Sequence, residues 1–137
     1  MSDKTVLFVD DEEKILKSIK RITFNKPFKA LFAGSGQEAL RVLEQHSDIS
    51  VLVTDMRMPE MTGLELLRTC KEKYPKIVRI VLSGYSQIST LLTAINQGEI
   101  FRYILKPWEN EEELMAAVNA GFDHYEQVQT PVAAESE

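Results

Sequence analysis

Apolar and polar residues follow two repeating patterns along the chain. Five short runs, each followed by a turn or loop, are rich in apolar or β-branched residues: residues 5–9, 28–33, 51–54, 77–82 and 101–105. Runs of this length are typical of strands buried in a parallel sheet. Between and after them, apolar residues recur every three or four positions, as on one face of a helix. The pattern therefore predicts strands and helices that alternate.

Capping residues and prolines set the limits of the predicted helices. The first helix follows the acidic residues 10–13 and runs to about residue 24. Ser35 and Glu38 fit a capping box at the start of the second. Pro75 stops the third, over residues 64–74, and the fourth runs from residue 88 to near residue 98. Asn110 is expected to cap the last helix, which runs to about residue 125.

The order of these elements predicts an α/β fold. Alternating strands and helices are the signature of a parallel sheet with helices on both faces. Right-handed crossovers leave few topologies, and a doubly wound sheet of five strands and five helices, in the flavodoxin-like order 2-1-3-4-5, satisfies them. The second run, residues 28–33, is partly polar and is expected at an edge.

Length and composition indicate one domain. The chain has 137 residues, with 44% hydrophobic and 27% charged residues, which is ordinary for a globular protein. We expect the domain to cover residues 1–126. Residues 127–137 are small, polar and acidic, and we expect them to form a disordered tail or the start of a linker.

Charge and cysteine content narrow the partners and the compartment. A net charge of −5 argues against direct nucleic-acid binding, which needs a basic patch. No apolar run approaches the length of a membrane span, so no membrane contact is expected. Cys70, the single cysteine, cannot form an internal disulfide and is read as an inert helix residue. These features predict a cytoplasmic protein.

Polar groups stand at the carboxyl ends of four predicted strands. Asp10 and Asp11 follow the first, Asp55 the third, Ser83 the fourth and Lys106 the fifth. Because these ends share one edge of a parallel sheet, the side chains are expected to converge there, where such sheets bind ligands.

This set of groups suits phosphoryl transfer. Carboxylates packed together repel, and a hard cation such as Mg²⁺ or Mn²⁺ removes that cost. Lys106 and Ser83 offer a point charge and a hydroxyl to a tetrahedral anion. A carboxylate is an attested nucleophile for the phosphoryl group. We therefore expect Asp55 to be the reactive residue.

From about residue 5 to residue 125, the chain resembles the receiver domain of two-component response regulators. The resemblance rests on the acidic pair, a spaced Asp-Pro-Gly pattern, a hydroxyl, an aromatic residue and a Lys-Pro pair: Asp10, Asp11, Asp55, Pro59, Gly63, Ser83, Tyr103, Lys106 and Pro107. One departure is Gly84, where an alanine is commoner in the family.

The resemblance implies a role for each site residue. Asp55 would be the phosphoacceptor, with Lys106 contacting the phosphate and Ser83 and Tyr103 forming a switch pair. Mg²⁺ (or Mn²⁺) would be held by carboxylates and one backbone carbonyl: Asp10, Asp11, Asp55 and the carbonyl of Arg57. The bond before Pro107 is usually cis in the family.

The resemblance also implies partners. A histidine kinase, a phosphotransfer protein or a small acyl phosphate would supply the phosphoryl group. The face formed by the fourth helix, fifth strand and fifth helix would switch and signal to an output domain or partner protein, and the same face could form a homodimer. Such a domain is a self-catalysing phosphoacceptor and not an enzyme that turns over a separate substrate.

Three other classes of protein are weighed against this interpretation. A haloacid-dehalogenase-like phosphatase needs Asp-x-Asp after its first strand, whereas Asp10 and Asp11 are adjacent. A flavodoxin-like electron carrier needs a glycine- and hydroxyl-rich phosphate loop where this chain has four consecutive acids. A pseudo-receiver that never takes phosphate would not need the full set of acids, hydroxyl and lysine.

Overall fold

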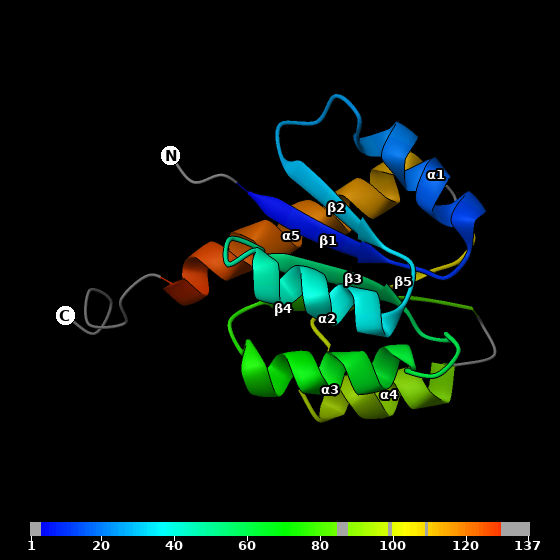
Figure 1. Cartoon of the computed structure of the whole chain (residues 1–137), viewed down its shortest axis with the longest axis vertical. Coiled ribbons are helices and arrows are strands. Elements are labelled where there is room, and N and C mark those ends of the chain that lie inside the picture. The colour runs from blue at the N-terminus through cyan, green and yellow to red at the C-terminus, as the bar shows by residue number, and fades with distance from the viewer. Residues whose placement is uncertain (1–3, 85–87, 99, 109, 130–137) are drawn as a thin grey trace.

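The five predicted strands form one parallel sheet. The computed structural model describes residues 4–84, 88–98, 100–108 and 110–129. The strands are β1 (Thr5–Val9), β2 (Lys29–Ala33), β3 (Val51–Asp55), β4 (Val78–Ser83) and β5 (Arg102–Leu105), in the order β2-β1-β3-β4-β5. The predicted strand order is confirmed, and the partly polar β2 lies at an edge as expected (Figure 1).

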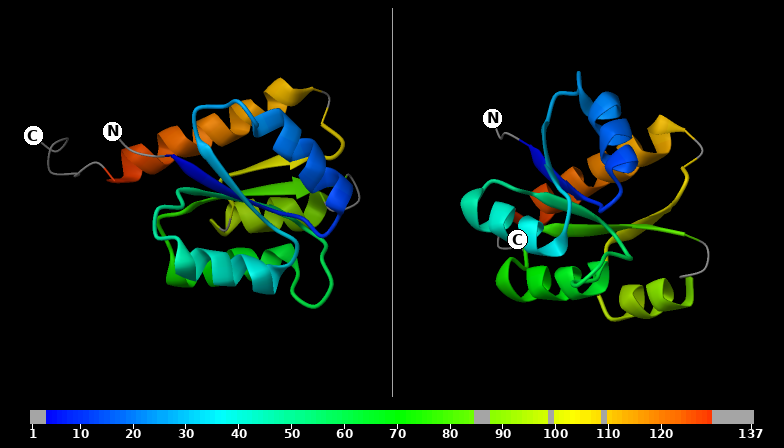
Figure 2. Two further views of the ribbon diagram at one scale, coloured as in Figure 1. Left: turned by 45° about the horizontal axis from the view of Figure 1, so that its top comes forward. Right: turned by 45° about the vertical axis from the view of Figure 1, so that its right-hand side comes forward.

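The five helices cover both faces of the sheet. They are α1 (Glu13–Thr23), α2 (Gly36–Gln45), α3 (Gly63–Lys73), α4 (Ile88–Asn96) and α5 (Glu111–Gln129). Helices α1 and α5 pack on one face, and α2, α3 and α4 pack on the other (Figures 1 and 2). Within the described ranges, no helix is long and apolar enough to cross a membrane.

The pleat of the central strands divides the core into two layers. Leu7, Leu52 and Val81 point toward α2, α3 and α4, while Phe8 and Ile80 point toward α1 and α5. All five side chains are fully buried. Successive residues of a strand face opposite sides, so strands covered by helices on both faces need apolar residues at consecutive positions. This is why the runs lack a polar face and why the pattern predicted them well.

Helix caps follow the prediction with one difference and one addition. The Ser35 hydroxyl accepts a hydrogen bond from the Glu38 N–H, but the Glu38 carboxylate accepts from the Gly34 N–H and not from that of Ser35. A complete capping box that was not predicted starts α3, between Thr62 and Glu65. The predicted Asn110 cap of α5 is confirmed by a bond from the Glu113 N–H.

Helix α5 continues past the predicted start of the tail. It ends at Gln129, three residues beyond residue 126. The reason is local, because Gln127 and Gln129 are good helix formers and the next helix breaker is Pro131. Residues 130–137, the rest of the predicted tail, lie outside the described residues.

Candidate functional site

The register of the sheet brings the predicted polar groups to one edge. Val9, the last residue of β1, lies opposite Thr54, so Asp10 and Asp55 extend from neighbouring strands at the same level. On the other side, Ser83 lies opposite Leu105. The Lys106 N–H donates to the Ser83 carbonyl at 2.8 Å, which fixes the start of the lysine segment beside β4. The predicted convergence is therefore confirmed.

Three carboxylates form a cluster at this edge. Oxygen atoms of Asp10, Asp11 and Asp55 all lie within 4.8 Å of one another. Asp10 and Asp55 are buried, whereas Asp11 is exposed. Oxygen-only donors with one side open to solvent suit a hard divalent cation that keeps some of its water ligands. The residues present therefore fit the predicted Mg²⁺.

Lys106 supplies the positive charge that this cluster needs. Its Nζ lies 2.9 Å from Asp55 Oδ1, 3.3 Å from Asp10 Oδ2 and 3.2 Å from Glu12 Oε1. Burial alone would lower the pKa of Lys106, but its hydrogen bond to Asp55 and the charge of Asp10 raise that pKa above the usual range. The ammonium is therefore charged at any physiological pH.

Burial has the opposite consequence for the two inner carboxyl groups. It raises the pKa of Asp10 to about 6, although the Glu12 N–H and Lys106 favour the charged form. Burial also raises the pKa of Asp55, against the stabilising hydrogen bond and charge of Lys106. Each carboxylate costs more to ionise than it would in water, so a cation at this edge is favoured.

A close backbone approach shapes the loop after Asp55. The Gly63 N–H donates to the Met56 carbonyl at 3.0 Å, and the Met56 N–H donates to the Leu82 carbonyl at 3.2 Å. A Cβ atom on Gly63 would overlap the Asp55 carbonyl oxygen and lie 3.0 Å from the Met56 Cα. The glycine was predicted as loop punctuation, and the structure gives the physical reason for it.

The predicted switch residues lie on one face of neighbouring strands. Tyr103 is opposite Val81 in the register, two positions before the pair formed by Ser83 and Leu105. Ser83 is fully buried and donates from its hydroxyl to the Gly84 carbonyl, while Tyr103 is 37% exposed. A Cβ atom on Gly84 would meet no atom of the described residues within 4 Å.

Two further site predictions have different outcomes. The bond between Lys106 and Pro107 is cis, as the resemblance implied. Arg57 is exposed, and the role of its carbonyl stays a prediction. Sequence reasoning missed Glu12 as a partner of Lys106, although its place directly after the acidic pair was a usable signal.

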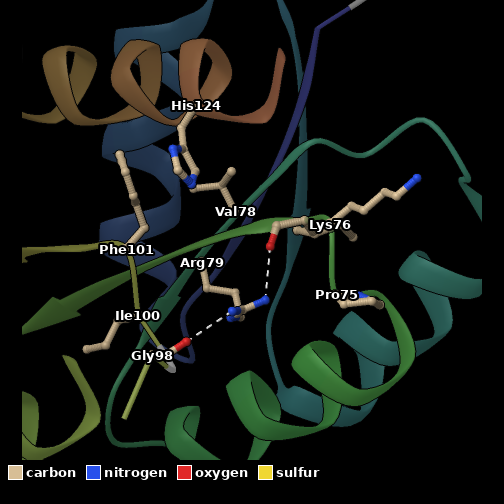
Figure 3. A pocket seen from close by; sticks show the side chains of 9 residues that line it. Pro75, Lys76, Val78, Arg79, Gly98, Ile100, Phe101 and His124 are labelled. Atoms are coloured by element: carbon tan, nitrogen blue, oxygen red, sulfur yellow. Dashed lines mark hydrogen bonds between the residues drawn. The ribbon is translucent and has the colours of Figure 1, made fainter. Parts of the chain in front are cut away.

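A hollow of about 240 Å³ lies at the opposite end of the sheet, at the start of β4 and β5. There Arg79 donates to the carbonyls of Ile77 and Gly98, and His124 stacks on Phe101 with ring centroids 4.6 Å apart (Figure 3). His124 therefore provides an aromatic contact between α5 and the residue before β5. The described residues that line the hollow include no carboxylate, so this hollow is chemically different from the acidic cluster at the other end of the sheet.

Comparison with known proteins agrees with this geometry. A family model for the response regulator receiver domain matches residues 6–119. The hydrogenase transcriptional regulatory protein HoxA of Cupriavidus necator is 44% identical over 110 residues, which cover 79% of this chain and 22% of that protein. The chain thus spans about a fifth of the length of this curated relative.

Solved structures share the fold over nearly their whole length. A receiver domain protein of a response regulator from Clostridium thermocellum is similar with a TM-score of 0.85 and 30% identity, covering 92% of this chain and 99% of that one. A protein described as adenylate cyclase from Rhodopirellula baltica reaches a TM-score of 0.90 at 31% identity and covers 98% of both chains.

Proposed function

This chain belongs to the response regulator receiver domains, and on that premise we propose that Asp55 accepts a phosphoryl group in a signalling pathway. The observation that carries the proposal is the contact of 2.9 Å between Asp55 Oδ1 and Lys106 Nζ, at the strand edge where three carboxylates meet. A positively charged lysine beside the nucleophile can stabilise the negative charge on the oxygens of the transferring phosphoryl group.

The proposed step is an in-line displacement. A carboxylate oxygen of Asp55 forms a bond to phosphorus, and the bond from phosphorus to the donor breaks. The donor atom, a histidine nitrogen of a kinase or phosphotransfer protein or an oxygen of an acyl phosphate, leaves with the electron pair. Water later attacks the acyl phosphate, which releases inorganic phosphate and restores Asp55. Lys106 holds the Asp55 side chain in place before the step.

Receiver domains bind Mg²⁺ at an acidic aspartate cluster, and Asp10, Asp11 and Asp55 form such a cluster here. In the proposal these side chains and the Arg57 carbonyl hold the ion, which neutralises charge on the phosphoryl oxygens when bound. Asp10 is fixed for this task because its Oδ1 accepts from the Glu12 N–H at 2.9 Å.

Signalling would run from Ser83 to the face formed by α4, β5 and α5. The Ser83 hydroxyl would leave the Gly84 carbonyl and donate to the new phosphoryl group. Tyr103 is 37% exposed, so its ring would become more buried on turning inward. Coupling between two such sites is typically about 1–3 kcal/mol, which is enough to shift the population of two states.

Several wider predictions belong to this proposal. They are a histidine kinase or phosphotransfer partner, an output domain or partner protein, dimerisation through the α4-β5-α5 face, and a cytoplasmic location. They are supported by family membership and by relatives much longer than this chain. Receiver domains are not turnover enzymes, so a phosphatase acting on a separate substrate is not favoured.

The experiment is labelling with Mg²⁺ and acetyl phosphate or phosphoramidate. One base-labile phosphoryl group per chain is expected, detected by intact mass. Asp55→Asn should abolish it, because an amide is not a nucleophile. Asp123→Asn, the same change at an exposed aspartate on α5, should leave labelling unchanged. Equal labelling of Asp55→Asn and the wild type would contradict the proposal. A wild type that takes no label would favour a pseudo-receiver.

A further inference from the structure

All the hydrogen-bonding capacity of the Lys106 ammonium is in use. An ammonium has three N–H donors. The structure places three carboxylates within reach of Nζ: Asp55 at 2.9 Å, Glu12 at 3.2 Å and Asp10 at 3.3 Å. Phosphorylation converts the Asp55 carboxylate into an acyl phosphate, so the N–H that Asp55 accepts passes to the phosphoryl group. Lys106 can give that group a second N–H only if Asp10 or Glu12 gives way.

The three partners differ in how well water can replace the lysine. The side chains of Asp10 and Asp55 are 0% and 9% exposed, whereas that of Glu12 is 63% exposed. Releasing Asp10 would take a hydrogen-bond donor from a carboxylate that water cannot reach, which is costly whether or not Mg²⁺ is bound. Releasing Glu12 moves an exposed carboxylate into water, where an ion pair contributes little. Of the two partners that phosphorylation leaves unchanged, Glu12 is therefore released at the lower cost.

The local backbone directs Glu12 to this position. Glu12 is the N-cap residue of α1, yet its side chain makes no capping hydrogen bond. Its N–H is held by Asp10 Oδ1 at 2.9 Å, so its backbone is tied to the acidic cluster. The usual N-cap residues have short side chains that accept from the first helical turn. The longer Glu12 side chain instead reaches Lys106, a residue 94 positions away in the sequence.

We propose that Glu12 is a positioning residue that occupies one N–H of Lys106 in the unphosphorylated state and competes with the phosphoryl group for it. This inference rests on the proposed function. Glu12 keeps Lys106 over the acidic cluster and makes the phosphorylated state less favourable than it would otherwise be. It has no place among the residues that carry the family resemblance.

Glu12→Gln tests the competition, and Glu13→Gln is the matched control. Both variants remove one negative charge from the start of α1. Glu13 is exposed and is not among the partners of Lys106 that the described residues provide. With Mg²⁺ at saturation, binding of beryllofluoride, a phosphoryl mimic, is followed by ¹⁹F NMR. Glu12→Gln should tighten binding about two- to fivefold, the range that an exposed ion pair can supply.

A second measurement needs no phosphoryl mimic. The Lys106 side-chain Cε–Hε NMR signals should shift in Glu12→Gln and stay in place in Glu13→Gln. Equal tightening of beryllofluoride binding in both variants would mean that charge alone acts, and would overturn the proposal. Unmoved Lys106 signals in Glu12→Gln would overturn it too, whether or not the wild type binds beryllofluoride. A wild type that does not bind beryllofluoride, while its Lys106 signals respond to Glu12→Gln, overturns the proposed function and the competition but not the contact.

Discussion

Gly63→Ala should damage both the stability of the domain and the reactivity of Asp55. Gly63 is the first residue of α3, and an added Cβ atom would overlap the Asp55 carbonyl oxygen. The same atom would lie 2.9 Å from the Asp55 carbonyl carbon and 3.0 Å from the Met56 Cα. All three obstacles are backbone atoms, so no side-chain rotation can relieve the overlap.

The size of the effect follows from two opposing contributions. Overpacking costs about 1–3 kcal/mol, and a backbone obstacle places this case near 3 kcal/mol. Alanine in place of glycine in a helix returns at most about 1 kcal/mol. A net loss of about 2 kcal/mol in the free energy of unfolding should lower the melting temperature by about 6–10 °C for a domain of this size. Because the overlap displaces the nucleophile's own backbone, phosphorylation should slow by about tenfold or more.

The assay is thermal unfolding in EDTA, followed by circular dichroism, together with the initial rate of labelling by phosphoramidate. Gly34→Ala is the control, since a Cβ atom there would come no closer than 3.5 Å, to Glu38 Oε1. The reasoning would be refuted if Gly63→Ala melted within about 2 °C of Gly34→Ala and kept its labelling rate, because the loop would then have room for a methyl group.

Three other outcomes are expected. Cys70 is fully buried and burial raises its pKa to about 11, so a disulfide reagent at pH 8 should modify it only after urea unfolds the chain; rapid modification of the native protein would contradict this. Asp11→Ala should weaken the rise in melting temperature that saturating Mg²⁺ causes, and an undiminished rise would remove Asp11 from the metal site. Ser83→Ala should accept phosphate more slowly and lose most of the NMR perturbation that beryllofluoride causes at Tyr103 and Trp108; full transmission would make the Gly84 backbone the better candidate.

The fold and the positions of the site residues could be predicted because they depend on topology. Once strands and helices alternate and the sheet is parallel, all carboxyl ends meet at one edge. Asp10, Asp55, Ser83 and Lys106 each end or follow a strand, so their meeting needed no knowledge of side-chain contacts. Errors of about one residue in the strand limits did not matter, because a polar residue at or just after the end of a strand still lies at the same edge of the sheet.

The details that escaped prediction depend on distances between atoms. Gly63 was recognised as loop punctuation, but only coordinates show that its missing Cβ atom makes room for the Asp55 carbonyl. Glu38 fits a capping box by spacing, yet its carboxylate reaches Gly34, because two N–H groups at adjacent positions are nearly equivalent targets. His124 has no strand-end position to mark it, and its stacking on Phe101 joins α5 to the residue before β5.

Electrostatics at the strand edge connect these local details to the proposed signal. The pKa of Asp10 and that of Asp55 are raised by burial, whereas that of Lys106 is raised by the carboxylates around it. Negative charge is therefore costly at this edge, and once Asp55 is phosphorylated the Lys106 ammonium must divide its three N–H groups among the phosphoryl group, Asp10 and Glu12. A movement of Lys106 toward the phosphoryl group must then displace groups that are held less firmly. Glu12 on the solvent side and Ser83, whose side chain carries no charge, are two groups that can move without leaving a buried charge unpaired.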